Sequence, residues 1–284
     1  MTFLELCKWG EKRLADAGVA DAGLDARYLL LEAFELDMAH FLLKQQEQVP
    51  TVDGRTREYS EAIQARAMRV PLQYLVGSQE FMGLSFQVDS RVLIPRQDTE
   101  TLVEMILKEH PEKETRILDL CTGSGCIAIS LAALGGYGQV DGADISGDAL
   151  EVARENGRRL APAVRFLEGD LFEALDEGAA YDVIASNPPY IATEVIEGLE
   201  PEVRDYEPRL ALDGDRDGLA FYRRIAAESR KFLADGGWLY LEIGYDQGEA
   251  LEALLRDNGF VGVRIVKDAA GNHRVACGQW PGAV

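Results

Sequence analysis

The sequence predicts an α/β protein whose main part is a mostly parallel, doubly wound sheet. Three features support this fold class. Strand-like and helix-like segments alternate from about residue 91 onward, the first ~70 residues carry apolar residues at helical spacing, and a short stretch between these regions alternates with a period of two. Strands separated by helices form βαβ units, which build parallel sheets covered by helices on both faces.

The N-terminal part is predicted to be a small helical bundle that spans residues 1–72. Apolar residues recur at i, i+4 and i+7 in one segment and at similar spacing in a second: Leu24, Tyr28 and Leu31, then Tyr59, Ile63, Ala67 and Val70. Pro50 and Gly54 interrupt the chain between the two segments. This bundle carries no chemistry of its own, so we expect it to dock a large substrate.

A β-hairpin is predicted over residues 73–90, where it links two domains. Leu84, Phe86 and Val88 alternate with polar residues, which is the period of a strand with one buried face. Met82-Gly83 supplies the expected turn.

The remaining residues, 91–284, are predicted to form one domain of alternating strands and helices. Its strands are expected at 116–120, 139–145, 163–169, 181–187, 237–243, 260–268 and 273–280. Its helices are expected at 126–134, 147–160, 218–233 and 248–259, the last ending at the helix-terminating Gly259.

Composition limits the class of protein and its partners. The chain has 284 residues, 47% of them apolar, and a formal net charge of −20, which disfavours binding to nucleic-acid phosphates. No charged leader with an apolar run opens the sequence, and no apolar run approaches 20 residues, so we expect a soluble cytoplasmic protein without membrane contact. The four cysteines and three histidines lack metal-ligand spacing, and we expect no metal.

A glycine-rich loop directly after the strand at 116–120 predicts a site for an adenosine-containing ligand. Gly123 and Gly125 allow the backbone to turn tightly and to approach a ligand at the following helix N-terminus. Asp144 ends the next strand, 21 residues after Gly123, where a carboxylate can accept both hydroxyls of a ribose. Asp170 and Phe172 follow the third strand, where they are placed to meet an adenine amino group and an adenine face. The loop alone leaves NAD and S-adenosylmethionine open.

The tetrapeptide Asn187-Pro188-Pro189-Tyr190 follows the fourth strand and decides between these ligands. The prolines have no N–H, so their carbonyls stand free beside the Asn187 side-chain oxygen and form a pair of acceptors. Such a pair suits a planar NH₂ group, and Tyr190 offers a flat wall beside it. Two acceptors that hold both hydrogens can aim the nitrogen lone pair at an electrophilic methyl group, which favours S-adenosylmethionine.

The sequence also resembles a known family. The motifs "DLCTGSG", "GADIS" and "SNPPY" are similar to class I S-adenosylmethionine-dependent methyltransferases that act on amide or base NH₂ groups. Residues 71–100 and 207–225 resemble the release-factor glutamine methyltransferases of the HemK/PrmC type, and the stretch "IPRQDTE" favours them over the related enzymes that act on a ribosomal protein. Gln97 stands where that family commonly has proline, and Cys121 where it commonly has glycine.

This resemblance implies a Rossmann-like, seven-stranded methyltransferase sheet and a role for each motif residue. The expected cofactor contacts are Cys121, Thr122, Gly123, Ser124, Gly125, Asp144, Asp170, Phe172 and Asn187. The expected catalytic and substrate-binding residues are Asn187, Pro188, Pro189 and Tyr190. Arg96 and Glu100 are candidates either for closing the site or for plain surface charge.

The implied substrate is the glutamine of the Gly-Gly-Gln motif in class I peptide-chain release factors, and we expect the enzyme to act as a monomer. The alternatives are a ribosomal-protein glutamine or an adenine amino group in DNA. A DNA enzyme would need a basic groove or a target-recognition segment, and the sequence presents neither. A non-catalytic S-adenosylmethionine-binding protein would not need Asn187 to Tyr190, and an NAD oxidoreductase would leave that tetrapeptide unexplained.

Overall fold

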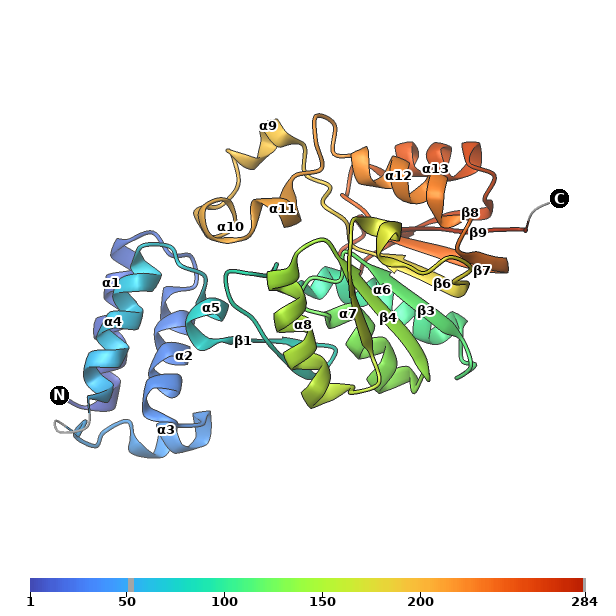
Figure 1. Ribbon diagram of the computed structural model, residues 1–284. Coiled ribbons are helices and arrows are strands. Elements are labelled where there is room, and N and C mark those ends of the chain that lie inside the picture. The colour runs from blue at the N-terminus through green and yellow to red at the C-terminus, as the bar shows by residue number, and fades with distance from the viewer. Residues whose placement is uncertain (51–53, 283–284) are drawn as a thin grey trace. The chain divides into compact units, whose positions relative to one another are not determined.

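The computed structural model describes residues 1–50 and 54–282, and the chain forms two compact units. The first unit comprises Met1–Ser78 together with Glu200–Tyr206, and the second comprises Gln79–Leu199 together with the chain from Glu207 onward. Figure 1 shows the helical character of the first and the central sheet of the second. Among the described residues, no helix is long and apolar enough to cross a membrane.

The first unit is entirely helical over its described residues apart from short connections. Its helices are α1 (Phe3–Asp16), α2 (Ala22–Phe34), α3 (Met38–Lys44), α4 (Arg55–Ala67), α5 (Leu72–Val76) and α10 (Pro201–Tyr206). Thr2 starts α1 with a capping box, because its side chain accepts from the Glu5 N–H while the Glu5 carboxylate accepts from the Thr2 N–H. Asp37 caps α3 with its side chain alone, which accepts the His40 N–H at 2.7 Å.

Two of the three residues of the apolar stripe that predicts α2 lie on its outer face. Leu24 and Tyr28 are each 48% exposed, while Ala26, Leu29 and Leu30 are buried in the core of the unit. The helix prediction is therefore confirmed, but of the three periodic residues only Leu31 packs against the core. Leucine and alanine occur on both faces of this segment, so spacing alone could not select the buried face.

The helix α10 belongs to the first unit although it lies far along the chain. Arg66 of α4 is nearly buried and pairs with Asp25 at 2.7 Å and with Glu202 of α10 at 2.8 Å. Arg69 binds the same Glu202 at 2.6 Å. Charged residues that are buried need such partners, so these pairs fix α10 to the bundle.

The predicted β-hairpin is confirmed. Strands β1 (Ser78–Phe81) and β2 (Leu84–Gln87) form a two-stranded sheet. Met82 and Gly83 connect them with φ values of +52° and +72°. Two consecutive left-handed residues are what a tight two-residue hairpin turn requires.

The second unit contains a mixed, mostly parallel sheet of seven strands, which confirms the predicted fold class. The strands are β3 (Arg116–Leu120), β4 (Gln139–Asp144), β5 (Arg165–Glu168), β6 (Tyr181–Ser186), β7 (Leu233–Glu242), β8 (Val261–Lys267) and β9 (His273–Gln279). Their order is β5-β4-β3-β6-β7-β9-β8, and only β9 runs antiparallel to its neighbours. The strand order reverses between β3 and β6, which is where open α/β sheets bind ligands.

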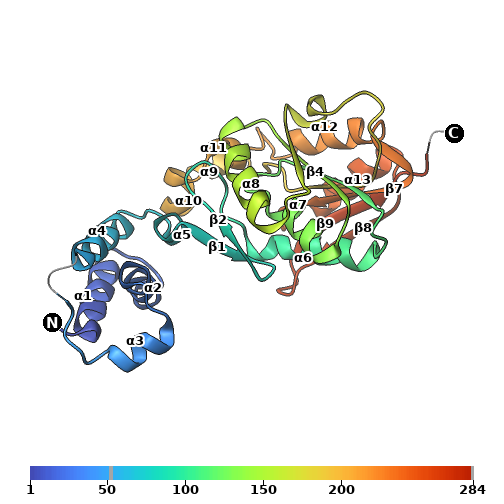
Figure 2. The ribbon, with the colours of Figure 1, turned by 60° about the horizontal axis from the view of Figure 1, so that its bottom comes forward.

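Helices cover both faces of this sheet. The helices of the unit are α6 (Gln97–Glu109), α7 (Cys126–Ser130) with its π-helical extension Leu131–Gly135, α8 (Gly147–Leu160), the 3-10 turn Leu171–Ala174, α9 (Thr193–Ile196), α11 (Arg209–Leu212), α12 (Ala220–Ser229) and α13 (Gly248–Asp257). In Figure 1, α12 and α13 lie above the sheet and α6 and α7 below it, and Figure 2 shows the same arrangement from another side.

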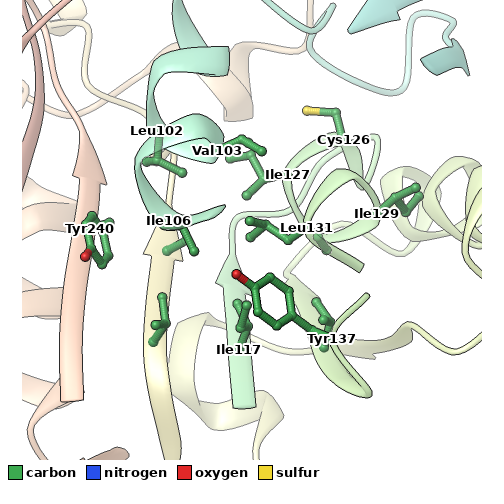
Figure 3. Packing of buried hydrophobic residues seen from close by; sticks show 14 of the residues in the cluster. Leu102, Val103, Ile106, Ile117, Cys126, Ile127, Ile129, Leu131, Tyr137 and Tyr240 are labelled. Carbon is green, nitrogen blue, oxygen red and sulfur yellow. The ribbon is translucent and has the colours of Figure 1, made fainter. Parts of the chain in front are cut away.

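Alternation along the strands produces two cores. Val183 and Ala185 of β6 face the layer of α6 and α7, while Ile184 faces the layer of α12 and α13. Figure 3 shows the first layer, in which apolar side chains of α6 and α7 pack together with Ile117 of β3 and Tyr240 of β7. A sheet that is buried on both faces explains the near-continuous apolar runs that predicted its strands.

One helix prediction needs correction, and one helix of the structure was not predicted. The helix predicted over residues 218–233 is limited to Ala220–Ser229, because Leu233 already pairs with Tyr181 at the start of β7. The helix α6 was not predicted, although its Leu102, Val103 and Ile106 are fully buried. All four cysteines are free thiols, and among the described residues no group of three or more His, Cys, Asp or Glu side chains could hold a metal ion.

Candidate active site

A cavity lies at the carboxyl ends of the central strands of the second unit. The loops after β3, β4, β5 and β6 contribute to its wall, as expected for the point where the strand order reverses. The lining residues are Arg91, Val92, Leu93, Cys121, Gly123, Ala143, Asp144, Ile145, Ser146, Ala149, Asp170, Leu171, Asn187, Pro189, Pro208, Leu210, Ala211, Phe221 and Arg224. Most are apolar, and the few charged groups are concentrated in Asp144, Asp170, Arg91 and Arg224, which is typical of a small-molecule site.

The glycine loop after β3 needs left-handed backbone at three positions. Cys121, Gly123 and Gly125 have φ values of +59°, +55° and +80°. A Cβ on Gly125 would lie 2.9 Å from the Ile129 side chain, whereas a Cβ on Gly123 would meet nothing within 4 Å and would occupy open space at the cavity wall. Gly125 is therefore required for packing of the loop, and Gly123 leaves room for a ligand.

Cys121 accepts the same left-handed conformation without being glycine. Such a residue is uncommon and costs about 1 kcal/mol or more, and strain of this kind concentrates at ligand sites. Burial raises the pKa of its thiol, so the side chain is a neutral, weakly polar part of the wall rather than a nucleophile.

Asp144 joins the loop to the end of β4. One carboxylate oxygen accepts the Gly123 N–H and the other accepts the Ser146 N–H, each at 2.9 Å. Burial raises the pKa of this carboxyl, and the two backbone donors act in the opposite direction. Each oxygen still has a free lone pair, so Asp144 can bind ligand hydroxyls while it holds the loop.

The other loop residues from the sequence prediction lie behind the wall. The Thr122 hydroxyl donates to the buried Asp119 carboxylate at 2.5 Å, and the Ser124 carbonyl accepts from the Asn156 side chain at 3.0 Å. Neither residue lines the cavity, and nor does Gly125. Their position supports the shape of the loop rather than direct ligand contact.

The two predicted adenine neighbours differ in position. Asp170 lines the cavity and pairs with Arg224 of α12 at 2.9 Å. Phe172 is 3% exposed and stacks on Phe232, with ring centroids 5.0 Å apart, inside the core. The expected contact of Phe172 with an adenine face does not agree with this position, because packing with Phe232 turns the ring inward. Leu171 lines the wall instead, with a left-handed φ of +52°.

The tetrapeptide after β6 lies at the cavity with its side chains tied to neighbouring elements. Asn187 and Pro189 line the wall, whereas Pro188 is buried and Tyr190 stands behind the wall. The Asn187 side-chain NH₂ donates to the Thr99 hydroxyl oxygen at 3.4 Å, and the Tyr190 hydroxyl donates to Glu242 at 3.5 Å. Gln247 donates to the Tyr190 carbonyl at 3.1 Å.

Arg96 and Glu100 have partners outside the cavity. Arg96 pairs with the buried Glu207, and the Glu100 carboxylate accepts the Met82 N–H at 2.6 Å. Neither residue lines the cavity. Arg96 instead pairs with Glu207, the residue at which the chain re-enters the second unit, and Glu100 binds the backbone of the hairpin turn.

Comparison with known proteins shows which family the chain matches. Residues 5–77 match the PrmC N-terminal domain, and residues 96–199 match the methyltransferase small domain. The chain is 40% identical over 278 residues to the release factor glutamine methyltransferase of Geobacter sulfurreducens, covering 98% of this chain and 96% of that protein. It is 43% identical over 279 residues to the Moorella thermoacetica protein of the same name, covering 96% and 97%.

The chain belongs to the release factor glutamine methyltransferase family.

Solved structures support the fold of this family member. A methyltransferase from Pyrococcus furiosus, 19% identical, superimposes with a TM-score of 0.54 over 78% of this chain and 98% of that one. Such a likeness shows the methyltransferase fold alone.

Several residues at the site of this methyltransferase were not predicted from sequence. Thr99 and Glu242 contact the tetrapeptide from α6 and β7, and Arg224 pairs with Asp170. Thr99 lies within the "IPRQDTE" stretch, between the two charged residues Arg96 and Glu100 that the sequence analysis considers. Glu242 ends an apolar strand, and a carboxylate in that position was a signal that could have been used.

Proposed function

We propose that this protein transfers a methyl group from S-adenosylmethionine to the side-chain amide nitrogen of a glutamine in a release factor. The observation that carries the proposal is the position of Asn187 and Pro189 at the cavity wall, within a chain that matches its relatives over nearly their full length. We propose further that the glutamine is that of the Gly-Gly-Gln motif in class I peptide-chain release factors.

The residues at the strand ends fit S-adenosylmethionine. Asp144 would accept the ribose hydroxyls, and the open space at Gly123 would admit the ligand close to the backbone. Asp170 would accept from the adenine amino group, with Leu171 beside the ring, and Cys121 would face the methionine part. When bound, the sulfonium of this cofactor supplies an electrophilic methyl group.

The tetrapeptide would hold the acceptor. The Asn187 side-chain oxygen and the Pro188 carbonyl accept the two hydrogens of the glutamine NH₂, and Pro189 and Tyr190 shape the slot around it. An amide nitrogen is a poor nucleophile because its lone pair is delocalised into the carbonyl. Holding both hydrogens favours a pyramidal nitrogen and aims its lone pair, and alignment of this kind can contribute several kcal/mol to catalysis.

The decisive experiment follows methyl transfer from labelled S-adenosylmethionine to three acceptors. These are a class I release factor, the same factor with its Gly-Gly-Gln glutamine replaced, and duplex DNA. We expect label on the first only, and Asn187→Ala should abolish it while leaving the melting temperature unchanged. Label on DNA, or label that survives replacement of the glutamine, refutes the proposed substrate.

We also propose that the first unit docks the release factor. Large apolar side chains are exposed on its helices α2 and α3, with Leu42 at 55% and Leu43 at 80% exposure. Leu43→Glu should lower kcat/KM for the whole release factor at least about tenfold, while leaving kcat/KM for a short Gly-Gly-Gln peptide unchanged. Equal loss with both substrates would show that the variant acts on folding or on the site rather than on docking.

A further inference from the structure

A buried carboxyl group stands behind the tetrapeptide. Glu242 ends β7 and is 1% exposed, and the parallel register pairs its neighbour Leu241 with Ser186, so Glu242 stands beside Asn187. Its Oε1 lies 3.5 Å from the Tyr190 hydroxyl, while Oε2 has no well-formed hydrogen bond among the described residues. A buried polar atom in this condition is costly and calls for a functional reason.

Thr99 connects this carboxyl to Asn187. Thr99 is 2% exposed in the first turn of α6, and its hydroxyl oxygen lies 3.4 Å from the Asn187 side-chain nitrogen. The Thr99 hydroxyl is also the first of the groups that lower the pKa of the Glu242 carboxyl. A hydroxyl has a single hydrogen, so when this hydrogen points at the carboxylate, the oxygen can only accept from Asn187.

The direction of this hydrogen decides which end of the Asn187 carboxamide faces the cavity. The oxygen and nitrogen of a carboxamide are nearly identical in shape, and only their partners fix the orientation. With Thr99 as acceptor, the NH₂ of Asn187 turns inward and its oxygen turns outward. The reverse orientation would present a donor to the NH₂ group of the substrate and could not hold it.

We propose that Glu242 is a positioning residue that, through Thr99, orients the Asn187 carboxamide with its oxygen toward the acceptor amide. The same carboxylate accepts from the Tyr190 hydroxyl and fixes its position. The buried charge of Glu242 therefore orients two of the four side chains of the tetrapeptide. This proposal rests on the proposed function and adds residues from two other elements to it.

The groups around Glu242 make the orientation of the Asn187 carboxamide depend on pH. Burial raises the pKa of Glu242 to about 7, the Thr99 and Tyr190 hydroxyls and Arg274 lower it, and Asp98 raises it. The titratable and charged groups that face it are Asp98 from α6, Cys126 from α7, Tyr190, Tyr222 from α12 and Arg274 from β9. Below that pKa the carboxyl itself carries a hydrogen and can donate it to the Thr99 oxygen. The Thr99 hydrogen can then point at Asn187, which reverses the orientation of the Asn187 carboxamide.

The first test compares Thr99→Val, which removes the hydroxyl but keeps the shape, with Thr99→Ser, which restores it. Wild type must first methylate the release factor, and if it does not, the proposed function fails rather than this inference. We expect Thr99→Val to lower kcat about 100-fold, with the Kd of S-adenosylhomocysteine changed less than about twofold, and Thr99→Ser to recover most of the loss. Thr115→Val, at another buried threonine of the same unit, serves as the control that keeps full activity.

The second test uses Glu242→Gln, whose NH₂ group can donate to Thr99 at every pH. In wild type, kcat should rise as the pH passes about 7, and Glu242→Gln should stay low throughout without this step. A measurement that does not depend on turnover is the NMR signal of the Asn187 side-chain NH₂, which is identified by its loss in Asn187→Asp. This signal should shift with pH near 7 in wild type and stay fixed in Glu242→Gln.

The inference is overturned if Thr99→Val keeps full kcat or if Glu242→Gln retains the pH step of wild type. It is also overturned if the variants lose cofactor affinity in proportion to kcat, since that result indicates a general structural role. If Thr99→Val does not fold, the pH dependence of kcat and of the NMR signal in wild type and Glu242→Gln decides alone.

Discussion

Replacing either glycine of the loop after β3 by alanine separates the packing of the loop from its contact with a ligand. Both positions have left-handed backbone, with φ of +55° at Gly123 and +80° at Gly125. They differ in what an added methyl group would meet. At Gly125 it would lie 2.9 Å from Ile129, 3.2 Å from Phe166 and 3.3 Å from Ala153, whereas at Gly123 it would enter open space beside the cavity.

These contacts set the expected magnitudes. A left-handed alanine costs about 1–2 kcal/mol at either position. Gly125→Ala adds overpacking in a core that cannot relax freely, about 1–3 kcal/mol, so its free energy of unfolding should fall by about 2–5 kcal/mol. Gly123→Ala should lose only the backbone contribution, but its methyl group occupies ligand space, and we expect the Kd of S-adenosylhomocysteine to rise at least about tenfold.

The stability assay is urea unfolding followed by tryptophan fluorescence in a Trp9→Phe background. The remaining tryptophans, Trp238 and Trp280, then report on the second unit alone. Calorimetric titration gives the affinity for S-adenosylhomocysteine. The reasoning fails if Gly125→Ala is no less stable than Gly123→Ala, or if Gly123→Ala binds the ligand as tightly as wild type.

Two further predictions concern buried charge. Arg66→Met leaves the buried Asp25 without its cation, while Glu202 keeps Arg69, and should lower the free energy of unfolding of the first unit by about 3–5 kcal/mol, measured by Trp9 fluorescence with the other tryptophans replaced by phenylalanine. Arg57→Met, which breaks a solvent-exposed pair, is the control and should leave the urea midpoint unchanged. Burial raises the pKa of Glu242 from 4.5 to about 7, so the folded protein keeps a proton that the unfolded chain loses, and the free energy of unfolding should fall as the pH rises through this window. Glu242→Gln should remove on the order of 3 kcal/mol of this fall, leaving the part due to the similarly buried Asp119, and an unchanged pH dependence of the urea midpoint would contradict the reasoning.

Local pattern was enough to predict most of the fold. Each of the seven strands of the sheet is a short apolar segment, and each was predicted within a few residues of its observed bounds, except that β7 begins four residues early. The hairpin turn at Met82-Gly83 was also predictable, since two left-handed residues between alternating segments are a local requirement. Helix α6 was not predicted, although its buried residues have helical spacing.

Long-range pairing was not predictable in the same way. The assignment of Glu200–Tyr206 to the helical unit depends on Arg66 and Arg69, more than 130 residues away along the chain, and no local pattern encodes such a pair. The inward turn of Phe172 depends on Phe232 in the same way. Periodicity also left the buried face of α2 open, and only packing of the whole bundle selected it.

The sequence by itself determined the kind of chemistry at this site. Glycines where the backbone must be left-handed, a carboxylate at the end of the second strand of the sheet, and the acceptor pair predicted at Asn187-Pro188 are properties of residue type and short spacing. Only the tertiary structure decided which residues form the wall, which stand behind it, and which hold Asn187 in one orientation. The physical reason is that hydrogen-bond direction and burial depend on neighbours that meet only when β7 and α6 pack beside the end of β6.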